Sequence, residues 1–196
     1  GRDILEILEQ NKDIWKKKAP MFQLQKLVTG VEVAVGTFFN GKDFIYPINV
    51  NFEHKRVFPG NLGQFAGEMG TLMFWSQPNV LFSSTLGKMK DALAESGYIG
   101  YIDINCIVNG SGIYPLEITA RFGFPTFHIQ SDSMLMPVSE FFYRLASGEN
   151  FEIKVKNGFH LGTRIVVPPF PFDDKKTFHS FSKDNPIIFK KPILEG

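Results

Sequence analysis

Acidic residues on a predicted β-hairpin are the part of the sequence best suited to chemistry. Asp103 and Asn105 alternate along one strand, Glu117 and Thr119 alternate along the next, and the short turn 109–112 joins the strands. Side chains two residues apart on a strand share a face, so we expect Asp103 and Glu117 to face each other across the hairpin. Their carboxylate oxygens suit Mg²⁺. The hairpin therefore predicts a magnesium site, and the alternative is a solvated strand face with an ordinary cross-strand pair.

Basic residues near this hairpin could neutralise phosphate oxygens. Arg121 follows the second strand, and three potential cations stand together upstream, at His54, Lys55 and Arg56. The next segment is rich in glycine, with Gly60, Gly63, Gly67 and Gly70. Such a segment can bring backbone N–H groups close to an anion, although its spacing matches neither a Walker loop nor a dinucleotide fingerprint. Residues 53–70 are therefore predicted to form a long functional loop, with a solvated turn as the alternative.

The remaining reactive side chains lack a partner at a useful spacing. No metal-ligand spacing relates the histidines His128, His160 and His179. Cys106 is the only cysteine, which excludes an internal disulfide framework and a cysteine-rich zinc site. Its apolar neighbours within a predicted strand indicate a buried, unreactive thiol.

The composition is that of a globular domain with no nucleic-acid or membrane partner. The 196 residues are 43% hydrophobic and 21% charged, and the net charge is +1. This balance gives no electrostatic reason to bind nucleic acid. No apolar run approaches the roughly 18 residues that a membrane span needs. Because residues 1–18 are charged and helix-like, unlike a signal peptide, we expect the chain to be cytoplasmic.

Hydrophobic patterning predicts an α+β fold in which a mainly antiparallel sheet is flanked by a few helices. Helical spacing covers residues 3–10, 84–97 and 136–147. Strand patterns cover residues 22–28, 31–39, 43–51, 98–108, 113–119, 151–156 and 162–167. The dipeptide Asn40–Gly41 predicts a hairpin turn, and the tail to residue 196 is predicted to be extended. The 21 phenylalanines indicate a bulky core or a face that awaits a partner.

Three sequence motifs occur in an order typical of one enzyme family. They are QLQKLVTGVE at 23–32, EHKR at 53–56 with GQFAGEMG at 63–70, and EITARFGFP at 117–125. They resemble the hinge strand, the substrate loop and the metal strand of ATP-grasp ligases, and of glycinamide ribonucleotide synthetases (phosphoribosylamine–glycine ligases) in particular. The later segment HLGTRIVV at 160–167 resembles the start of that family's C-terminal domain. The likeness extends from about residue 22 to residue 170.

The resemblance implies an ATP-dependent carboxylate–amine ligase that works through an acyl phosphate. A carboxylate attacks the γ-phosphate of ATP, and an amine then displaces phosphate from the activated acid. Charge neutralisation and alignment supply most of the catalysis, so no protein nucleophile is needed. The implied cofactors are ATP and Mg²⁺, with Mn²⁺ as an alternative metal. The implied substrates are a small-molecule carboxylate and an amine.

The resemblance also implies a role for each motif residue. The implied metal ligands, on the metal-bearing lobe, are Asp103, Glu117 and Thr119. The implied catalytic cations are Arg121, Lys55 and Arg56. Adenine and ribose would contact the backbone of Lys26 and Leu27 and the side chain of Glu32. The implied substrate loop contributes His54, Gly63, Gly67 and Gly70.

Several positions depart from the family pattern. Thr119 stands where the synthetases have Asn, Phe124 replaces an Asp, and residues 64–66 replace Pro-Asn-Thr. A ligase for a different acid and amine is therefore an alternative. A second alternative is a non-catalytic relative that serves in binding or self-association.

The resemblance covers one lobe of an ATP-grasp fold. We expect residues 1–157 to form this partial ATP-grasp domain and residues 158–196 to begin a C-terminal domain or an extended tail. The other lobe is expected upstream in a longer chain, and the present stretch is expected to be inactive by itself. Without that lobe an apolar surface would be exposed, so a homo-oligomer through this surface is a further expectation.

Overall fold

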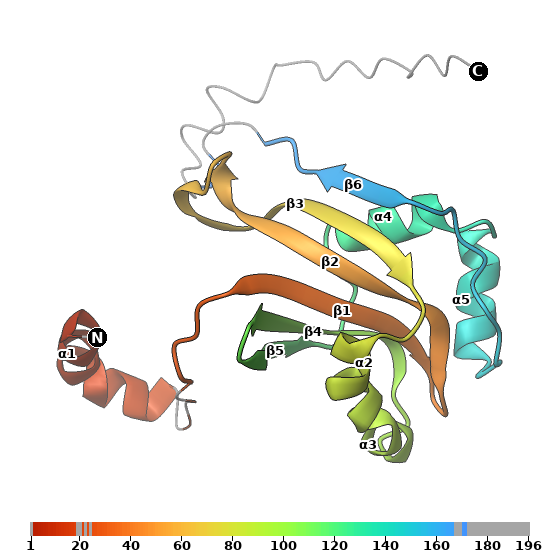
Figure 1. The fold of residues 1–196 in the computed structure, drawn as a ribbon. Helices are drawn as coiled ribbons and strands as arrows, with labels where there is room; N and C mark the ends of the chain where they lie inside the picture. The colour runs from red at the N-terminus through yellow and green to blue at the C-terminus, as the bar shows by residue number, and fades with distance from the viewer. Residues whose placement is uncertain (1, 19–20, 22, 24, 167–169, 172–196) are drawn as a thin grey trace, which may run out of the picture.

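The fold is built on a six-stranded antiparallel sheet with the strand order β5-β4-β1-β2-β3-β6 (Figure 1). The structure is a computed structural model that describes residues 2–18, 21, 23, 25–166 and 170–171. Its strands are β1 (Val31–Asn40), β2 (Phe44–Phe58), β3 (Leu62–Ser76), β4 (Ile99–Asn109), β5 (Gly112–Thr119) and β6 (Phe159–Thr163). Its helices are α1 (Arg2–Lys18), α2 (Val80–Ser84), the 3₁₀ helix η1 (Leu86–Met89), α3 (Lys90–Glu95), α4 (Thr126–Ser133) and α5 (Val138–Ala146). The predicted α+β class is confirmed.

The two faces of the sheet pack against different helices because side chains alternate along each strand. On one face, Phe39 and Ile104 pack with Phe82 of α2. On the other face, Phe38 packs with Phe141 of α5, and their ring centroids are 4.6 Å apart. Figure 1 shows α2 and α3 at one side of the sheet and α4 and α5 at another. None of the helices that the structure describes is long and apolar enough to cross a membrane.

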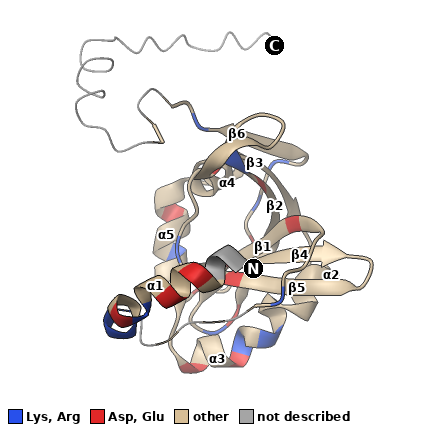
Figure 2. Cartoon of the chain, turned by 90° about the vertical axis from the view of Figure 1, so that its left-hand side faces the viewer, with Lys and Arg blue, Asp and Glu red and all other residues tan. Residues whose placement is uncertain are grey.

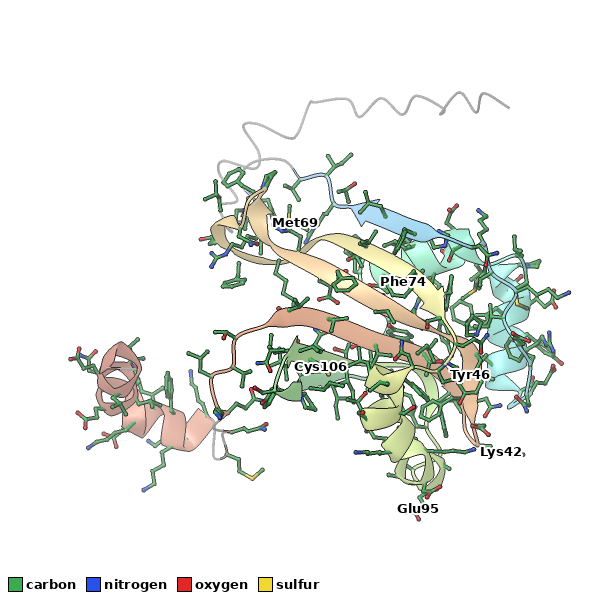
Figure 3. All side chains as sticks on the ribbon, in the orientation of Figure 1. Lys42, Tyr46, Met69, Phe74, Glu95 and Cys106 are labelled. Carbon is green, nitrogen blue, oxygen red and sulfur yellow. The ribbon has the colours of Figure 1, made fainter. Side chains whose placement is uncertain are left out.

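The two central hairpins form as the alternation predicts. β1 and β2 meet at the turn after Asn40, where Gly41 has φ of 92°. β4 and β5 meet at the turn between Asn109 and Gly112. Cys106 lies within β4 and is fully buried, and burial raises the pKa of its thiol to about 11 (Figure 3). The prediction of a buried cysteine is therefore confirmed.

Residues 53–70 form the ends of two strands, and the predicted long loop is wrong. β2 continues to Phe58, and β3 begins at Leu62. The pairing of these strands contains two register shifts, and Gly63 and Gly67 have φ of 81° and 78°. Such irregularities interrupt the regular alternation of side chains, which is why the sequence pattern predicted β2 only at 43–51 and missed its end and the start of β3.

The strand predicted at residues 22–28 does not form among the described residues. Residues 23 and 25–29 lie outside the sheet, and residues 22 and 24 are outside the described part of the chain. Among the described residues, the backbone of this segment joins no strand ladder. The side chain of Gln25 instead donates to the carbonyl of Leu116 at 2.8 Å.

Before this segment, α1 confirms the predicted N-terminal helix. It stands apart from the sheet and carries both signs of charge (Figure 2).

The helix predicted at residues 84–97 is divided, and α4 was not predicted. Thr85 has φ of −125° and ψ of −97°, so α2 ends there before η1 and α3 continue. The buried residues of α4 are mostly polar, with Gln130 and Ser133 among them, so hydropathy does not mark its inner face. By contrast, α5 confirms the helix predicted at 136–147.

The strand predicted at residues 151–156 is also wrong. This segment makes a single bridge, between Val155 and Met134. Its other backbone bonds are isolated, such as the one from Ile153 to the carbonyl of Tyr46 in β2, so no regular ladder forms. β6 begins at Phe159, three residues before the strand predicted at 162–167. The predicted extended tail beyond residue 171 lies outside the described residues.

Candidate functional site

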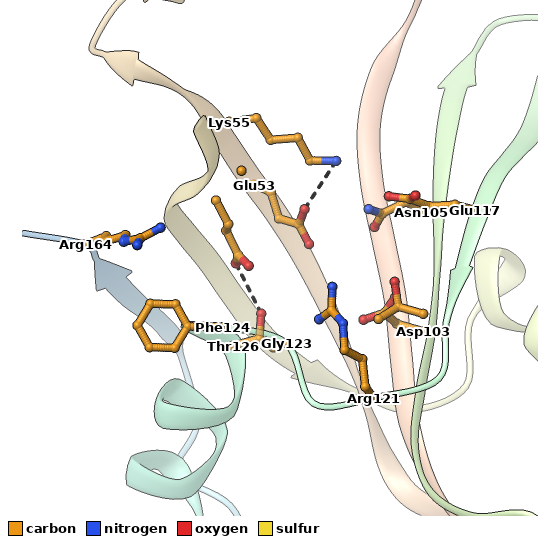
Figure 4. Close-up of a pocket in the computed structure, with 13 residues that line it drawn as sticks. Glu53, Lys55, Asp103, Asn105, Glu117, Arg121, Gly123, Phe124, Thr126 and Arg164 are labelled. Carbon is orange, nitrogen blue, oxygen red and sulfur yellow. Dashed lines mark hydrogen bonds and ion pairs between the residues drawn. The ribbon is translucent and has the colours of Figure 1, made fainter. Parts of the chain in front are cut away.

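A cavity of about 440 Å³ lies between β2, β3, β4, β5 and the segment that leads into α4 (Figure 4). Its acidic lining residues are Glu53, Glu68, Asp103 and Glu117. Its basic lining residues are Lys55, Arg121 and Arg164. Neutral groups, including Asn105, Thr119, Phe124 and Thr126, complete the wall. The cavity therefore brings oxygen ligands and cations together in one place.

Two rows of directly paired residues cross the sheet beside this cavity. One row contains Asn49, Gly36, Asp103 and Thr119. The other contains Asn51, Ala34, Asn105 and Glu117. Paired residues of an antiparallel sheet share a face, so the predicted convergence of Asp103 and Glu117 on one face is confirmed. Their direct partners differ from the expectation, however, because Asp103 is opposite Thr119 and Glu117 is opposite Asn105.

Asp103 is a buried carboxyl with an unusual proton affinity. Burial, together with the charge of Glu53, raises the pKa of Asp103 to about 7. Hydrogen bonds from Thr119 and Tyr101 and the charge of Arg121 oppose this shift. A cation in the cavity would favour the ionised form of Asp103, so the site has a place for positive charge.

Glu68 and Glu53 add two further carboxyls whose ionisation is disfavoured. Burial raises the pKa of Glu68 to about 8, and the charges of Glu53 and Asp103 act in the same direction. The hydroxyl of Thr126 donates to Glu68 at 3.3 Å and partly offsets the rise. Burial also raises the pKa of Glu53, which Lys55 opposes. The cavity thus holds more acidic groups than its fixed cations balance.

Lys55 provides a fixed positive charge on one wall. Its Nζ contacts Glu32 and lies 3.5 Å from a carboxylate oxygen of Glu53. Burial lowers the pKa of Lys55, but the hydrogen bond with Glu32 and the charges of Glu53, Glu32 and Glu117 outweigh burial and raise it. Lys55 therefore stays protonated at neutral pH.

Two arginines contribute guanidinium groups from different sides. Figure 4 shows Arg121 below Glu53 and beside Asp103, with Arg164 across the cavity. The guanidinium of Arg164 lies 5.6 Å from the ring centroid of Phe124. Within the described part of the chain, neither arginine forms an ion pair. Both guanidinium groups can therefore bind an anionic ligand.

The cavity brings together about half of the predicted site residues. Those that line it are Lys55, Gly67, Asp103, Glu117, Thr119 and Arg121. Gly67 has a positive φ, and a Cβ there would meet nothing within 4 Å, so its backbone borders open space. Glu32 is not in the lining but contacts Lys55.

The other predicted residues lie away from the cavity lining. Arg56 stacks on Phe65 at 4.3 Å and donates to the carbonyl of Gly63, at the end of the β2–β3 hairpin. The ring of His54 is 3.0 Å from the carbonyl of Phe58 in the same hairpin. Gly70 is paired inside β3, between β2 and β6. Lys26 and Leu27 are exposed in the segment before β1.

Sequence reasoning missed several lining residues, including Glu53, Glu68, Asn105, Thr126 and Arg164. Two of them carried a usable signal. Asn105 alternates with Asp103, and Glu53 alternates with Lys55 once β2 is known to extend that far. Glu68 and Arg164 had no such signal, because they reach the cavity only through the pairing of β3 with β2 and with β6.

The donor set on β4 and β5 fits a magnesium ion that also binds phosphate. Among the described residues, no three His, Cys, Asp or Glu side chains form a group that could hold a metal by themselves. Mg²⁺ usually takes one or two protein carboxylates and completes its octahedron with water and phosphate oxygens. Glu117 is opposite the amide of Asn105 and diagonal to Asp103. Together these three side chains supply that kind of partial ligand set.

Sequence comparison relates the chain to one group of ligases. The phosphoribosylamine–glycine ligase of Streptococcus pyogenes is 24% identical over 161 residues, which are 78% of this chain and 38% of that protein. The enzyme of the same name from Listeria monocytogenes is 22% identical over 159 residues, 76% of this chain and 37% of that protein. The chain thus spans less than two fifths of the length of these relatives. No family model matches the chain.

Structural comparison shows a shared fold. Phosphoribosylamine–glycine ligase from Thermotoga maritima has a TM-score of 0.57 at 18% identity, over 75% of this chain and 39% of that one. N5-carboxyaminoimidazole ribonucleotide synthetase from Thermus thermophilus has a TM-score of 0.50 at 16% identity, over 78% and 41%. The chain therefore has the fold of the matching part of these ATP-grasp enzymes, and its sequence resembles the phosphoribosylamine–glycine ligases.

Proposed function

We propose that this chain carries the metal- and phosphate-binding part of an ATP-dependent ligase that joins a carboxylic acid to an amine, as the phosphoribosylamine–glycine ligases do. The observation that carries the proposal is the cavity, in which Asp103, Asn105 and Glu117 share a wall and lie near three cations. Nucleotide phosphates with a divalent cation need both kinds of group in one place. The likeness to known ligases supports the class of reaction.

In this proposal, Asp103, Asn105 and Glu117 hold Mg²⁺ against the phosphates of ATP. The ion, when bound, neutralises charge on the transferring phosphoryl group and orients it. Mn²⁺ has the same preference for oxygen ligands and can substitute. Thr119 acts mainly through its hydrogen bond to Asp103, since the two residues are directly opposed.

The proposed reaction has two steps, and each leaves the atoms balanced. First, a carboxylate oxygen of the acid attacks the γ-phosphorus of ATP, the bond to the bridging oxygen breaks, and ADP leaves. Second, the amine nitrogen attacks the acyl carbon, the bond from that carbon to the phosphate oxygen breaks, and the amine loses a proton. Lys55, Arg121 and Arg164 stabilise the phosphoryl oxygens through both steps because they are fixed cations on the cavity wall.

The proposal places the nucleoside end of ATP toward β1. We propose that the backbone of Lys26 and Leu27 meets adenine and that Glu32 meets the ribose. The contact between Glu32 and Lys55 supports this orientation of ATP, because it connects the start of β1 with the part of the cavity proposed to bind the phosphates. We also propose that the acceptor substrate binds near the hairpin end of β2 and β3, where it would contact Arg56, His54, Gly63 and Gly70.

A ligase for a different acid and amine is the second candidate. One observation favours it: residues 64–66, which replace the family's substrate-loop motif, lie within β3 and do not line the cavity, although Gly67 does. Phe65, one of these residues, instead packs against Arg56 within the same hairpin. The acceptor substrate would then be recognised by other groups.

Calorimetric titration of the 196-residue protein with ADP and Mg²⁺ tests the nucleotide site. The unaltered protein is expected to bind, and Glu117→Gln is expected to weaken binding about tenfold or more when Mg²⁺ is present. Glu95→Gln, a matched change on exposed α3 at the other face of the sheet, should leave the affinity unchanged. Absence of ADP binding by the unaltered protein would refute the proposed function.

A screen of ADP release separates the two candidates. Because the present stretch is expected to be inactive by itself, a longer chain that joins it to the other lobe is incubated with ATP, Mg²⁺ and pairs of acids and amines. Glycine and 5-phosphoribosylamine form one pair. Release that requires this pair supports the phosphoribosylamine–glycine type. Release that requires another acid and amine supports the second candidate.

A further inference from the structure

A buried hydrogen-bond chain connects the candidate metal site to helix α4. Gln130 of α4 donates from Nε2 to Oδ1 of Asn49 at 3.0 Å. Asn49 in turn donates from Nδ2 to the hydroxyl of Tyr101 and to Oδ1 of Asn51, each at 3.0 Å. The members are at most 1% exposed, so water does not replace these bonds. Among the described residues, two atoms of the chain, Nδ2 of Asn51 and Oε1 of Gln130, have no hydrogen-bond partner, so the chain is ordered by the bonds given above.

The chain reaches Asp103 because position 36 is a glycine. Gly36 is paired with Asn49 on one side and with Asp103 on the other. A Cβ at Gly36 would lie 2.1 Å from the hydroxyl of Tyr101 and 3.0 Å from Cβ of Asp103. The Tyr101 hydroxyl therefore occupies the space above Gly36, next to the side chain of Asp103.

The direction of each bond determines what Tyr101 can do. An amide Nδ2 is a donor, so the Tyr101 oxygen accepts from Asn49. Its one hydroxyl hydrogen is then left for another acceptor, and the neighbouring acid is Asp103, two residues along the same face of β4 and packed with Tyr101 around Gly36. Asn49 is itself held by three hydrogen bonds, so it fixes the hydroxyl from behind.

We propose that Tyr101 is a positioning residue for the cation site, oriented by Asn49 and Gln130, and that it holds the Asp103 carboxylate for a divalent cation. This inference rests on the proposed function, in which Asp103 helps to bind that cation. Thr119 holds Asp103 from β5, and Tyr101 holds it from within β4. Asp103 therefore keeps one orientation before any ligand arrives, which lowers the cost of binding.

Nuclear magnetic resonance tests the bond from Tyr101 to Asp103 without any metal. A buried hydroxyl that donates to a carboxylate should give a slowly exchanging, downfield proton resonance. We expect this resonance to disappear in Tyr101→Phe and to move upfield in Asp103→Asn. Tyr46→Phe is the matched control, because Tyr46 packs with Phe82 on the other face of the sheet. A resonance that is unchanged in Asp103→Asn would overturn the proposal.

Titration with Mn²⁺ alone, followed by electron paramagnetic resonance, tests the effect on the cation. Tyr101→Phe is expected to bind Mn²⁺ about tenfold more weakly than the unaltered protein, and Tyr46→Phe to bind equally. Asn49→Ala should weaken binding in the same direction, and the double variant Tyr101→Phe with Asn49→Ala should lose less than the sum of the two effects. Urea denaturation of each variant shows whether it is folded during the titration.

The outcomes separate this inference from the proposed function. If the unaltered protein binds no Mn²⁺, the cation site fails, and the positioning role fails with it. If all folded variants bind Mn²⁺ equally, the cation site stands and the positioning role is overturned. A loss of Mn²⁺ affinity confined to Tyr101→Phe and Asn49→Ala supports both the cation site and the positioning role of Tyr101.

Discussion

Asn105 on β4 is directly opposite Glu117 on β5, so an amide and a carboxylate form the central pair of the candidate metal site. Asn105 is 5% exposed, and the small Ala34 beside it on β1 leaves its side chain open to the cavity. We expect Asn105→Ala to lower the affinity for ADP about tenfold in the presence of Mg²⁺ and much less in its absence. Calorimetry measures both, with exposed Asn157→Ala as the control. An equal loss with and without Mg²⁺ would count against a metal ligand.

Thr119 controls the proton affinity of Asp103. Its hydrogen bond lowers the pKa of Asp103, which burial has raised to about 7. Removal of that bond in Thr119→Val should therefore raise the pKa of Asp103 above about 7. Carboxyl ¹³C resonances followed from pH 5 to pH 9 measure the change, and Thr163→Val on exposed β6 is the control. A pKa of Asp103 that stays the same or falls would contradict this role.

Glu68 should make stability depend on pH. Burial raises its pKa from 4.5 to about 8 in the folded protein, so the folded state retains a proton that the unfolded chain loses near pH 4.5. The contribution is fully present below about pH 4.5 and is lost as the pH rises through about 8. We expect Glu68→Gln to gain stability relative to the unaltered protein by about 1 kcal/mol or more between pH 5 and pH 8. Urea denaturation measures this difference, and Glu95→Gln should show no such trend.

Gly36 is required by the hydroxyl above it. A Cβ at this position would lie 2.1 Å from the Tyr101 hydroxyl, and Gly36→Ala is expected to destabilise the fold by about 1–3 kcal/mol. Gly110→Ala, where a Cβ meets nothing within 4 Å, is the control. In the double variant with Tyr101→Phe, the loss should be smaller than the sum of the single losses, because the closest clash is removed and only the one with the ring carbon Cζ, at 2.7 Å, and the one with Asp103 remain. Strictly additive losses in thermal denaturation would disprove this contact.

Arg164 should bind an anion at the cavity wall. We expect Arg164→Ala to weaken ADP binding several-fold and to reduce its dependence on salt, since a guanidinium binds phosphate by a charge-assisted hydrogen bond. Arg144→Ala is a matched control because Arg144 also stacks on a phenylalanine, Phe151 at 4.3 Å, but lies on α5 outside the cavity lining. Equal effects of the two substitutions on ADP affinity would argue against this role.

Local patterns in the sequence determined the two central hairpins. Alternating side chains and the turns at Asn40–Gly41 and 109–112 predicted β1, the first part of β2, β4 and β5, together with the shared face of Asp103 and Glu117. These features could be predicted because the period of a strand and the chemistry of a tight turn involve only neighbouring residues. The motif order likewise predicted the ATP-grasp fold.

Only the tertiary structure decided the rest of the site. Register shifts hid the strands at residues 53–70, and α4 buries polar residues such as Gln130, so hydropathy marked neither. Glu68 and Arg164 meet the hairpin carboxylates only because β3 pairs with both β2 and β6. The proton affinities of Asp103 and Glu68 depend on burial and on charges far away in the sequence. Such contacts are set by the packing of distant segments, which no local pattern of residues records.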